Sequence, residues 1–280
     1  MNVKKSKNKT FAKKSFGQNF LVDRSCVSKI ISALNPLEKE NIIEIGPGRG
    51  ALTEKILESG ANLTALELDR DLIPFLQNQF YGCKNLNLIE ADALKVDYSS
   101  FKNQNPDEKL KLVANLPYYI STAILQHLTN YQSEFEFLIV MLQREVVERI
   151  TATPGSKERG FLTVLIEASF ETQKLFDVSP DAFYPVPKVW SAVIRLIPKK
   201  INSADFNSRI LFREVISAGF AQKRKTIFNN LKNYLKDKIE TDKVLLHSEI
   251  ETNRRAETLS VEEWRRIVEK IKTIHAEIAD

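Results

Sequence analysis

The tetrapeptide Asn115-Leu116-Pro117-Tyr118 follows an apolar run, residues 110–114, that is typical of a buried strand. An amide side chain, a backbone carbonyl and an aromatic ring therefore stand together at a strand end. The two oxygens can accept hydrogen bonds from an exocyclic amine, and the ring can stack on a nucleobase. Ligands bind at strand ends in open α/β sheets, so these residues are candidates for holding a flipped adenine. The alternative is an ordinary strand-to-loop turn.

A glycine-rich turn lies upstream, where the apolar run 41–45 is followed by Gly46, Gly48 and Gly50. A segment with helical apolar periodicity comes directly after it, so the pattern predicts strand, turn and helix. Glycines let a ligand approach the main chain closely, and the start of a helix supplies unpaired N–H groups. A tight turn without a ligand would use the same glycines, so this motif alone indicates little.

Two further predicted strands are followed by acidic residues. The run 62–66 is followed by Glu67, about twenty residues after Gly46, which is the spacing expected for an acid that binds ribose hydroxyls. The run 86–89 is followed by Asp92, which could accept a hydrogen bond from an adenine amino group. Glu67 could instead be a solvated loop carboxylate and Asp92 a turn cap. Four successive strand ends with a possible ligand group nevertheless favour a common site.

Hydrophobic periodicity predicts the elements that position these residues. An amphipathic helix at 27–34 precedes strands that alternate with helical segments up to a fifth strand at 135–141. This alternation is typical of a parallel sheet with crossover helices. A helix at 161–170 and two last strands, at 172–178 and 192–197, complete an α/β domain with seven strands.

The composition changes at Pro198-Lys199-Lys200, and helical apolar spacing dominates beyond it. We therefore expect three parts: a basic N-terminal arm at 1–15, an α/β domain at 16–198 and a small helical domain at 199–280. At 280 residues, the chain is long enough for one sizeable domain and one small one.

The chain carries a net charge of +5 and a pI near 9.0, which favours a polyanionic partner. Lys223, Arg224 and Lys225 are expected to open a helix and to contact RNA phosphates rather than bases. A solvated arm and an exposed helix face are the alternative. The arm contributes a second basic cluster, which consists of Lys4, Lys5, Lys7, Lys9, Lys13 and Lys14.

Several classes of protein are excluded by composition. Cys26 and Cys83 are too few for a disulfide framework and are typical of reduced thiols. No segment is apolar enough to span a membrane, and the lysine-rich start lacks the apolar core of a secretory signal. The three histidines have no metal-ligand spacing. We expect a cytoplasmic monomer without a metal site.

In this order and spacing, the glycine turn, Glu67, Asp92 and the tetrapeptide resemble class I S-adenosylmethionine-dependent methyltransferases that act on an adenine amine. Two further segments, Phe16-Gly17-Gln18-Asn19-Phe20-Leu21 and Phe183-Tyr184-Pro185-Val186-Pro187-Lys188-Val189, narrow the resemblance. They are similar to the ribosomal RNA adenine dimethyltransferases that modify two adjacent adenines in the 3′-terminal hairpin loop of small-subunit rRNA. The similarity covers about residues 13–267.

The resemblance implies a Rossmann-like, mostly parallel sheet, S-adenosylmethionine as cofactor, and small-subunit rRNA or its ribosomal precursor as partner. The Asn115 side-chain oxygen and the Leu116 carbonyl would accept hydrogen bonds from the target amine. Tyr118 would stack on one face of the base and Phe183 on the other. The implied cofactor-binding residues are Asn19, Leu21, Gly46, Glu67, Asp92 and Asn115.

Three positions depart from the usual pattern of this family. Tyr119 stands where asparagine is usual, Ala123 where proline is usual, and Trp190 where an acid is common. Tyr119 could alter the rim of the pocket or the path of the RNA. Three other functions stay open: a large-subunit rRNA dimethyltransferase, a non-catalytic ribosome-assembly factor on the same fold, and a nicotinamide dehydrogenase.

Overall fold

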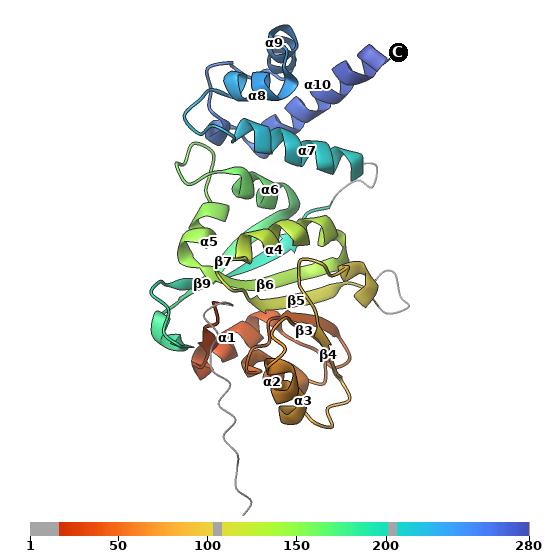
Figure 1. Cartoon of the computed structure of the whole chain (residues 1–280), viewed down its shortest axis with the longest axis vertical. Helices are drawn as coiled ribbons and strands as arrows, with labels where there is room; N and C mark the ends of the chain where they lie inside the picture. Colours follow the sequence, from red (N-terminus) through yellow and green to blue (C-terminus); the bar gives the residue numbers. More distant parts are fainter. Residues whose placement is uncertain (1–16, 103–107, 201–205, 280) are drawn as a thin grey trace, which may run out of the picture. The chain divides into compact units, whose positions relative to one another are not determined.

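The computed structural model describes residues 17–102, 108–200 and 206–279, and these form two compact units (Figure 1). The first unit contains the described residues up to Val147 together with Thr172–Pro198. The second contains Glu148–Glu171 and the described residues from Lys199 onward. The predicted basic arm, 1–15, lies outside the described residues.

A seven-stranded sheet forms the centre of the first unit, with the strand order β4-β3-β2-β5-β6-β9-β7. The strands β2 to β6 run parallel, and β9 runs antiparallel to β6. The predicted number of strands is therefore confirmed. The bounds are β2 (Asn41–Ile45), β3 (Asn62–Glu67), β4 (Leu86–Glu90), β5 (Leu110–Asn115), β6 (Phe135–Gln143), β7 (Phe170–Val178) and β9 (Ser191–Pro198).

The strand order reverses between β2 and β5, because β3 and β4 extend the sheet to one side of β2 while β5 and β6 extend it to the other. In an open α/β sheet, such a reversal leaves a crevice at the carboxyl ends of the central strands. The predicted glycine turn and the tetrapeptide follow these two strands. The topology therefore brings the two motifs to one place.

Helices cover both faces of this sheet, with α1, α2 and α3 on one face and α4 on the other (Figure 1). The central strands consist of apolar runs because they are buried on both faces. Their side chains pack with α1 and α2 in one core, which includes Ile30, Ile42 and Ile56. The helices are α1 (Arg24–Leu34), α2 (Ala51–Glu58), α3 (Leu72–Gln79) and α4 (Ser121–Leu128), and α5 (Arg144–Ile150) follows β6.

A separate two-stranded ribbon joins the segment before α1 to the segment after β7. Strand β1 (Phe20–Leu21) pairs antiparallel with β8 (Phe183–Tyr184). Asp23 caps α1 by accepting a hydrogen bond from the Cys26 N–H, so the chain turns directly from the ribbon into the helix. The ribbon fixes the N-terminal segment beside the glycine turn.

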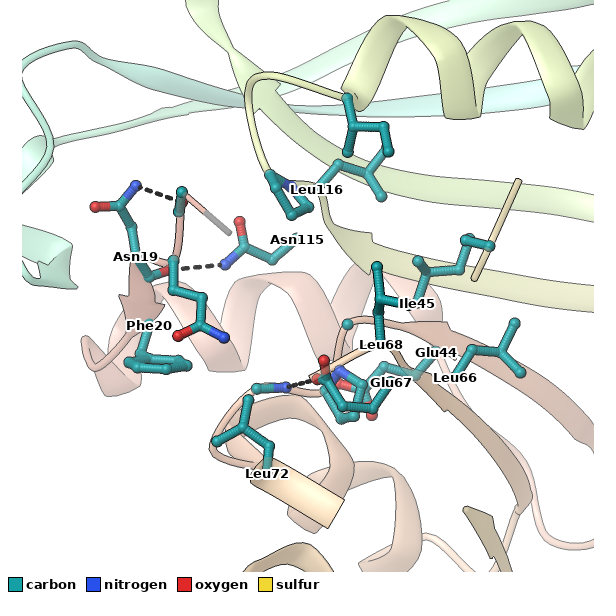
Figure 2. A pocket seen from close by; sticks show the side chains of 18 of the residues that line it. Asn19, Phe20, Glu44, Ile45, Leu66, Glu67, Leu68, Leu72, Asn115 and Leu116 are labelled. Carbon is teal, nitrogen blue, oxygen red and sulfur yellow. Dashed lines mark hydrogen bonds between the residues drawn. The ribbon is translucent and has the colours of Figure 1, made fainter. Parts of the chain in front are cut away.

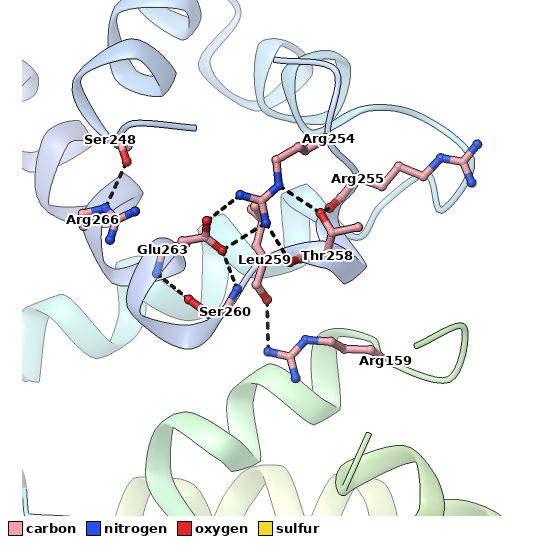
Figure 3. Close-up of polar contacts among 9 residues, drawn as sticks. All are labelled: Arg159, Ser248, Arg254, Arg255, Thr258, Leu259, Ser260, Glu263 and Arg266. Atoms are coloured by element: carbon pink, nitrogen blue, oxygen red, sulfur yellow. Dashed lines mark hydrogen bonds and ion pairs between the residues drawn. The ribbon is translucent and has the colours of Figure 1, made fainter. Parts of the chain in front are cut away.

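The second unit is helical and has its own core around the buried Trp264. Ser260 and Glu263 form a reciprocal capping box at the start of α10, since each side chain accepts a hydrogen bond from the other's N–H (Figure 3). Arg254 pairs with Glu263 and reinforces this start. The helices are α6 (Phe161–Ser169), α7 (Phe206–Gly219), α8 (Ile227–Leu235), α9 (Lys238–His247) and α10 (Val261–Ala279).

The buried Arg159 connects α6 to the C-terminal helices within this unit. Its guanidinium pairs with Glu167 at 2.6 Å. It also donates to the Leu259 carbonyl at 3.1 Å, as Figure 3 shows. The segment Glu148–Glu171 therefore belongs to the same unit as the helical tail, although it runs only as far as the start of β7 in the sequence. The domain division at 198 predicted from composition stays a prediction.

One predicted element is wrong. Lys223, Arg224 and Lys225 do not open a helix, because α8 begins at Ile227 behind the cap Thr226. The three basic residues lie in the exposed turn between α7 and α8. Within the described part of the chain, no helix combines the length and apolar character needed to cross a bilayer.

Candidate active site

A cavity opens at the carboxyl ends of β2, β3, β4 and β5 in the first unit (Figure 2). Four strand ends contribute to its walls, as the sequence predicts, and the N-terminal segment 17–21 contributes a fifth wall. The cavity thus occupies the point where the strand order reverses, which is the usual ligand site of this architecture.

The glycine turn after β2 depends on the absence of side chains. Gly46, Gly48 and Gly50 have φ values of +70°, +58° and +80°, a region that other residues rarely adopt. A Cβ on Gly50 would lie 2.7 Å from the Phe80 ring, and one on Gly48 would lie 3.0 Å from the Phe20 ring. Glycine is therefore required at 48 and 50 for the two rings to pack against the turn, while Gly46 and Gly48 line the cavity.

Glu67, at the end of β3, is buried rather than solvated, so the simple loop alternative does not hold. Its carboxylate accepts hydrogen bonds from the N–H of Asp69 at 2.9 Å and of Gly48 at 3.2 Å. Burial raises the pKa of Glu67 above its usual range, and these two N–H groups oppose part of that rise. Glu67 thereby joins the glycine turn to the end of β3.

Glu44 is a second buried carboxyl in the cavity wall, and the sequence patterns did not indicate it. It is 2% exposed and accepts hydrogen bonds from the Thr53 hydroxyl, at 2.6 Å, and from the Thr53 backbone N–H. Burial, with a smaller contribution from Glu67, raises the pKa of Glu44 to about 7. The only sequence signal was an acid inside the apolar run 41–45.

Asp92, after β4, has the capping role considered for it, while its role toward an adenine amine stays a prediction. One oxygen accepts the Leu94 N–H at 3.0 Å and caps the turn, while the residue lines the cavity. The carboxylate can accept several hydrogen bonds, so the cap does not exhaust it.

Asn115, at the end of β5, contacts the N-terminal segment. Its Nδ2 donates to the Asn19 carbonyl at 3.2 Å, and the Asn19 Nδ2 in turn donates to the Gly17 carbonyl at 3.2 Å (Figure 2). Because the amide nitrogen of Asn115 faces the chain, its oxygen is the group left to accept a hydrogen bond from a ligand. Leu21 also lines the cavity.

Leu116 and Tyr118 complete the wall that follows β5. Leu116 is buried, and its N–H donates to the Met141 carbonyl at 3.2 Å, which fixes the main chain at this point. The Tyr118 hydroxyl and the Ser191 hydroxyl are 2.7 Å apart and share a hydrogen bond. Burial raises the pKa of Tyr118, with the Ser191 hydrogen bond acting against it, so this phenol stays protonated at neutral pH.

The structure does not bring every predicted residue to the cavity. Phe183 is 2% exposed and packs in the core of the first unit with Leu21 and Val193, outside the cavity wall. Its stacking role stays a prediction. Lys223, Arg224 and Lys225 belong to the second unit. Among the described residues, no cluster of His, Cys, Asp and Glu could hold a metal ion.

The sheet combines parallel strands with the antiparallel β9, and a glycine turn and acids follow its successive strands. This combination defines a class I methyltransferase. The model of the family "Ribosomal RNA adenine dimethylase" matches residues 9–273. The chain belongs to this family, and the resemblance inferred from the motifs is confirmed.

Individual proteins agree with this assignment. The ribosomal RNA small subunit methyltransferase A of Clostridium botulinum strain Langeland is 41% identical over 276 residues, which are 98% of this chain and 100% of that protein. A dimethyladenosine transferase from Plasmodium falciparum has a TM-score of 0.72 at 25% identity, covering 91% of this chain and 98% of that one. The 23S rRNA methyltransferase ErmE has a TM-score of 0.66 at 24% identity, covering 91% and 100%; it shows a shared fold.

Proposed function

We propose that this protein dimethylates the 6-amino groups of two adjacent adenines near the 3′ end of small-subunit rRNA. Support comes from family membership and from the small-subunit methyltransferase of C. botulinum, which is similar over nearly its whole length. The large-subunit alternative has only a likeness of fold in its favour. We place the protein in the cytoplasm, with ribosome precursors, and we propose that it acts as a monomer.

The family depends on S-adenosylmethionine, and the residues of the cavity fit this cofactor. Bare backbone at Gly46 and Gly48 allows close approach of a ligand, while Glu67 and Asp92 offer acceptors suited to a ribose and an adenine amine. When bound, the cofactor supplies an electrophilic methyl group on a sulfonium.

The observation that carries the catalytic proposal is the orientation of Asn115. Its amide nitrogen is hydrogen-bonded to Asn19, so its oxygen can accept an N–H of the target amine, together with the Leu116 carbonyl. The amine of adenine is a weak nucleophile because its lone pair is delocalised into the ring. Two acceptors favour a pyramidal nitrogen and stabilise the positive charge that develops on it.

Tyr118 holds the base itself in this proposal. The Ser191 hydrogen bond fixes the phenol, so the ring is preorganised as a stacking surface at the cavity wall. Stacking contributes about 1–3 kcal/mol per base, which offsets much of the cost of extruding an adenine. No general base is needed before the transfer, because the methylated product is acidic and loses its proton readily.

Mass mapping of methylated nucleotides tests the proposal. The protein and labelled cofactor are incubated with unmethylated small subunits and, as a control, with large subunits. We expect dimethyladenine at two adjacent positions near the 3′ end of small-subunit rRNA. Methylation of large-subunit rRNA alone, or binding without transfer of label, would refute the proposal.

A further inference from the structure

Three large aromatic side chains of the first unit are exposed, one after β5, one in β8 and one directly before β9. Tyr119 is 59% exposed, Trp190 is 45% exposed and Tyr184 is 61% exposed. Tyr119 and Trp190 are two of the positions at which this chain departs from its family's usual pattern. An aromatic side chain exposed in a segment next to a ligand site is a candidate for binding a nucleobase by stacking.

The position of Trp190 is fixed by contacts of its backbone and of its ring with Arg144. Its carbonyl accepts a hydrogen bond from the Arg144 N–H at 2.9 Å, directly beyond the last paired residues of β6 and β9, Gln143 and Ser191. The Arg144 guanidinium lies over the indole, 5.7 Å from the ring centroid. An indole fixed by backbone contacts and by a cation–π contact is a preorganised surface.

This surface is connected to the active site through its next residue. Ser191 follows Trp190 and shares the 2.7 Å hydrogen bond with Tyr118, which lines the cavity. Tyr119 also lines the cavity. The exposed indole therefore lies only one residue from the contact that fixes the stacking surface for the target base.

The charge around the indole suits a nucleotide. Arg144 is exposed and close to the ring, and Lys188 is exposed on the same segment as Trp190. Single-stranded RNA is bound by this combination of an aromatic face for the base and cations for the phosphates.

We propose that Trp190 and Arg144 form a platform on which the nucleobase flanking the target adenine stacks. The inference rests on the proposed function, since the occupant is the neighbouring nucleotide of the same RNA. The platform would hold the second adenine of the pair in place while the first is in the cavity.

A hairpin RNA with a single abasic nucleotide tests the platform. The abasic site replaces the base on the 5′ or the 3′ side of the target adenine, and RNA affinity is measured for the natural chain, Trp190→Ala and Trp190→Phe. We expect Trp190→Ala to weaken binding of the intact hairpin about tenfold and Trp190→Phe to weaken it much less. An abasic nucleotide on one of the two sides should lower the RNA affinity of the natural chain about tenfold. The same abasic nucleotide should lower the affinity of Trp190→Ala hardly at all, because the stacking contact is already lost in that variant.

Tyr81→Ala is the matched control, because Tyr81 is 91% exposed and precedes the amino end of β4, at the opposite edge of the sheet. It should leave the affinity unchanged. Two results would overturn the platform. One is that the abasic nucleotides lower the RNA affinity of the natural chain and of Trp190→Ala equally, and the other is that Trp190→Ala binds the intact hairpin as tightly as the natural chain.

Fluorescence gives a second measurement that does not depend on turnover. The chain has two tryptophans, and Trp264 is buried in the second unit. RNA should quench the emission of the natural chain strongly and that of Trp190→Phe weakly. If RNA quenches the emission and the abasic hairpin shows the expected affinities, but no methyl group is transferred, the platform is supported and the proposed function is refuted. If methyl groups are transferred without quenching, the proposed function is supported and the platform is refuted.

Discussion

Asn115 combines a structural contact with the chemical role that we propose for it. Its nitrogen joins β5 to the N-terminal segment through the Asn19 carbonyl, which leaves its oxygen for the hydrogen bond that we propose to the target amine. The orientation is set by the chain before any substrate binds. This preorganisation is the reason to expect a large contribution to rate from a single hydrogen-bond acceptor.

We predict that Asn115→Ala lowers kcat about 10²–10³-fold, the loss typical of a preorganised transition-state contact. RNA affinity should change less than about threefold, because phosphate contacts elsewhere supply most of it. Single-turnover rates and filter binding measure the two effects. Asn87→Ala, an exposed position in β4, is the control. Parallel losses of rate and affinity would show that Asn115 supports RNA binding instead.

Glu44 makes the stability of the first unit depend on pH. Its pKa is about 7 in the folded chain, against an ordinary value of 4.5, so the folded state binds more protons between these values. The free energy of unfolding therefore falls as the pH rises from 4.5 to 7, by up to about 3 kcal/mol at about 1.4 kcal/mol per unit of pKa.

Glu44→Gln removes this titration and should flatten the dependence between pH 5 and pH 8. Urea unfolding at several pH values measures it. Glu54→Gln, an exposed position on α2, should keep the slope of the natural chain. Identical slopes for the natural chain and Glu44→Gln would show that Glu44 titrates at its ordinary value.

At the scale of elements, the ribbon of β1 and β8 depends on Phe183, whose side chain lies in the core. We predict that Phe183→Ala lowers the free energy of unfolding by about 3–5 kcal/mol, as expected for a buried phenylalanine. Phe183→Leu keeps most of the apolar volume and should lose much less. Denaturant unfolding of the cofactor-free protein measures both.

Turnover distinguishes this structural role from the stacking role that the resemblance implies. If Phe183→Ala is as stable as the natural chain but slow with saturating cofactor, the side chain must leave the core to reach the base. A loss of stability with normal turnover in the folded fraction would leave stacking to Tyr118 alone.

The strands and the glycine turn were predictable because their signals are local. The apolar runs gave the bounds of β2 to β6 nearly to the residue, and three glycines close together require positive φ. Two features were not predictable. The insertion of β9 between β6 and β7 depends on long-range pairing, and the burial of Glu44 depends on α2 covering it.

Phe183 illustrates the same limit at the candidate site. An aromatic residue beside a proline-rich segment can face a ligand or a core, and only the pairing of β8 with β1 decides between them. Asp92 and Glu67 both line the cavity, as their positions after strands predicted, because the carboxyl ends of parallel strands meet at one edge. Their hydrogen bonds to N–H groups could not be predicted, since these depend on the exact path of each turn.

At the scale of the whole molecule, the net charge of +5 favours a polyanionic partner, and the basic turn between α7 and α8 is the surface that we propose for RNA. The exposed turn of Lys223, Arg224 and Lys225 is held by the rest of the second unit. Asn230 on α8 donates to the carbonyls of Gly219 and Gln222 on either side of the turn's start. Among the side chains of the turn, Lys223 donates from Nζ to the exposed Lys157 carbonyl at 2.7 Å. A solvent-exposed contact of this kind contributes little to stability, so the three side chains can be replaced without unfolding the unit.

We predict that the triple variant Lys223→Ala, Arg224→Ala and Lys225→Ala binds small-subunit rRNA more weakly and with a flatter salt dependence. Each lost phosphate contact lowers the slope of log K against log salt by about 0.7–0.9, so a loss of about 2 is expected. Titrations between 50 and 200 mM salt, roughly the range in which such contacts are resolved, measure it. The control replaces Lys39, Lys84 and Lys95, three exposed lysines of the first unit, with alanine. Since both variants lose the same charge, equal slopes would mean that net charge rather than this turn attracts the RNA.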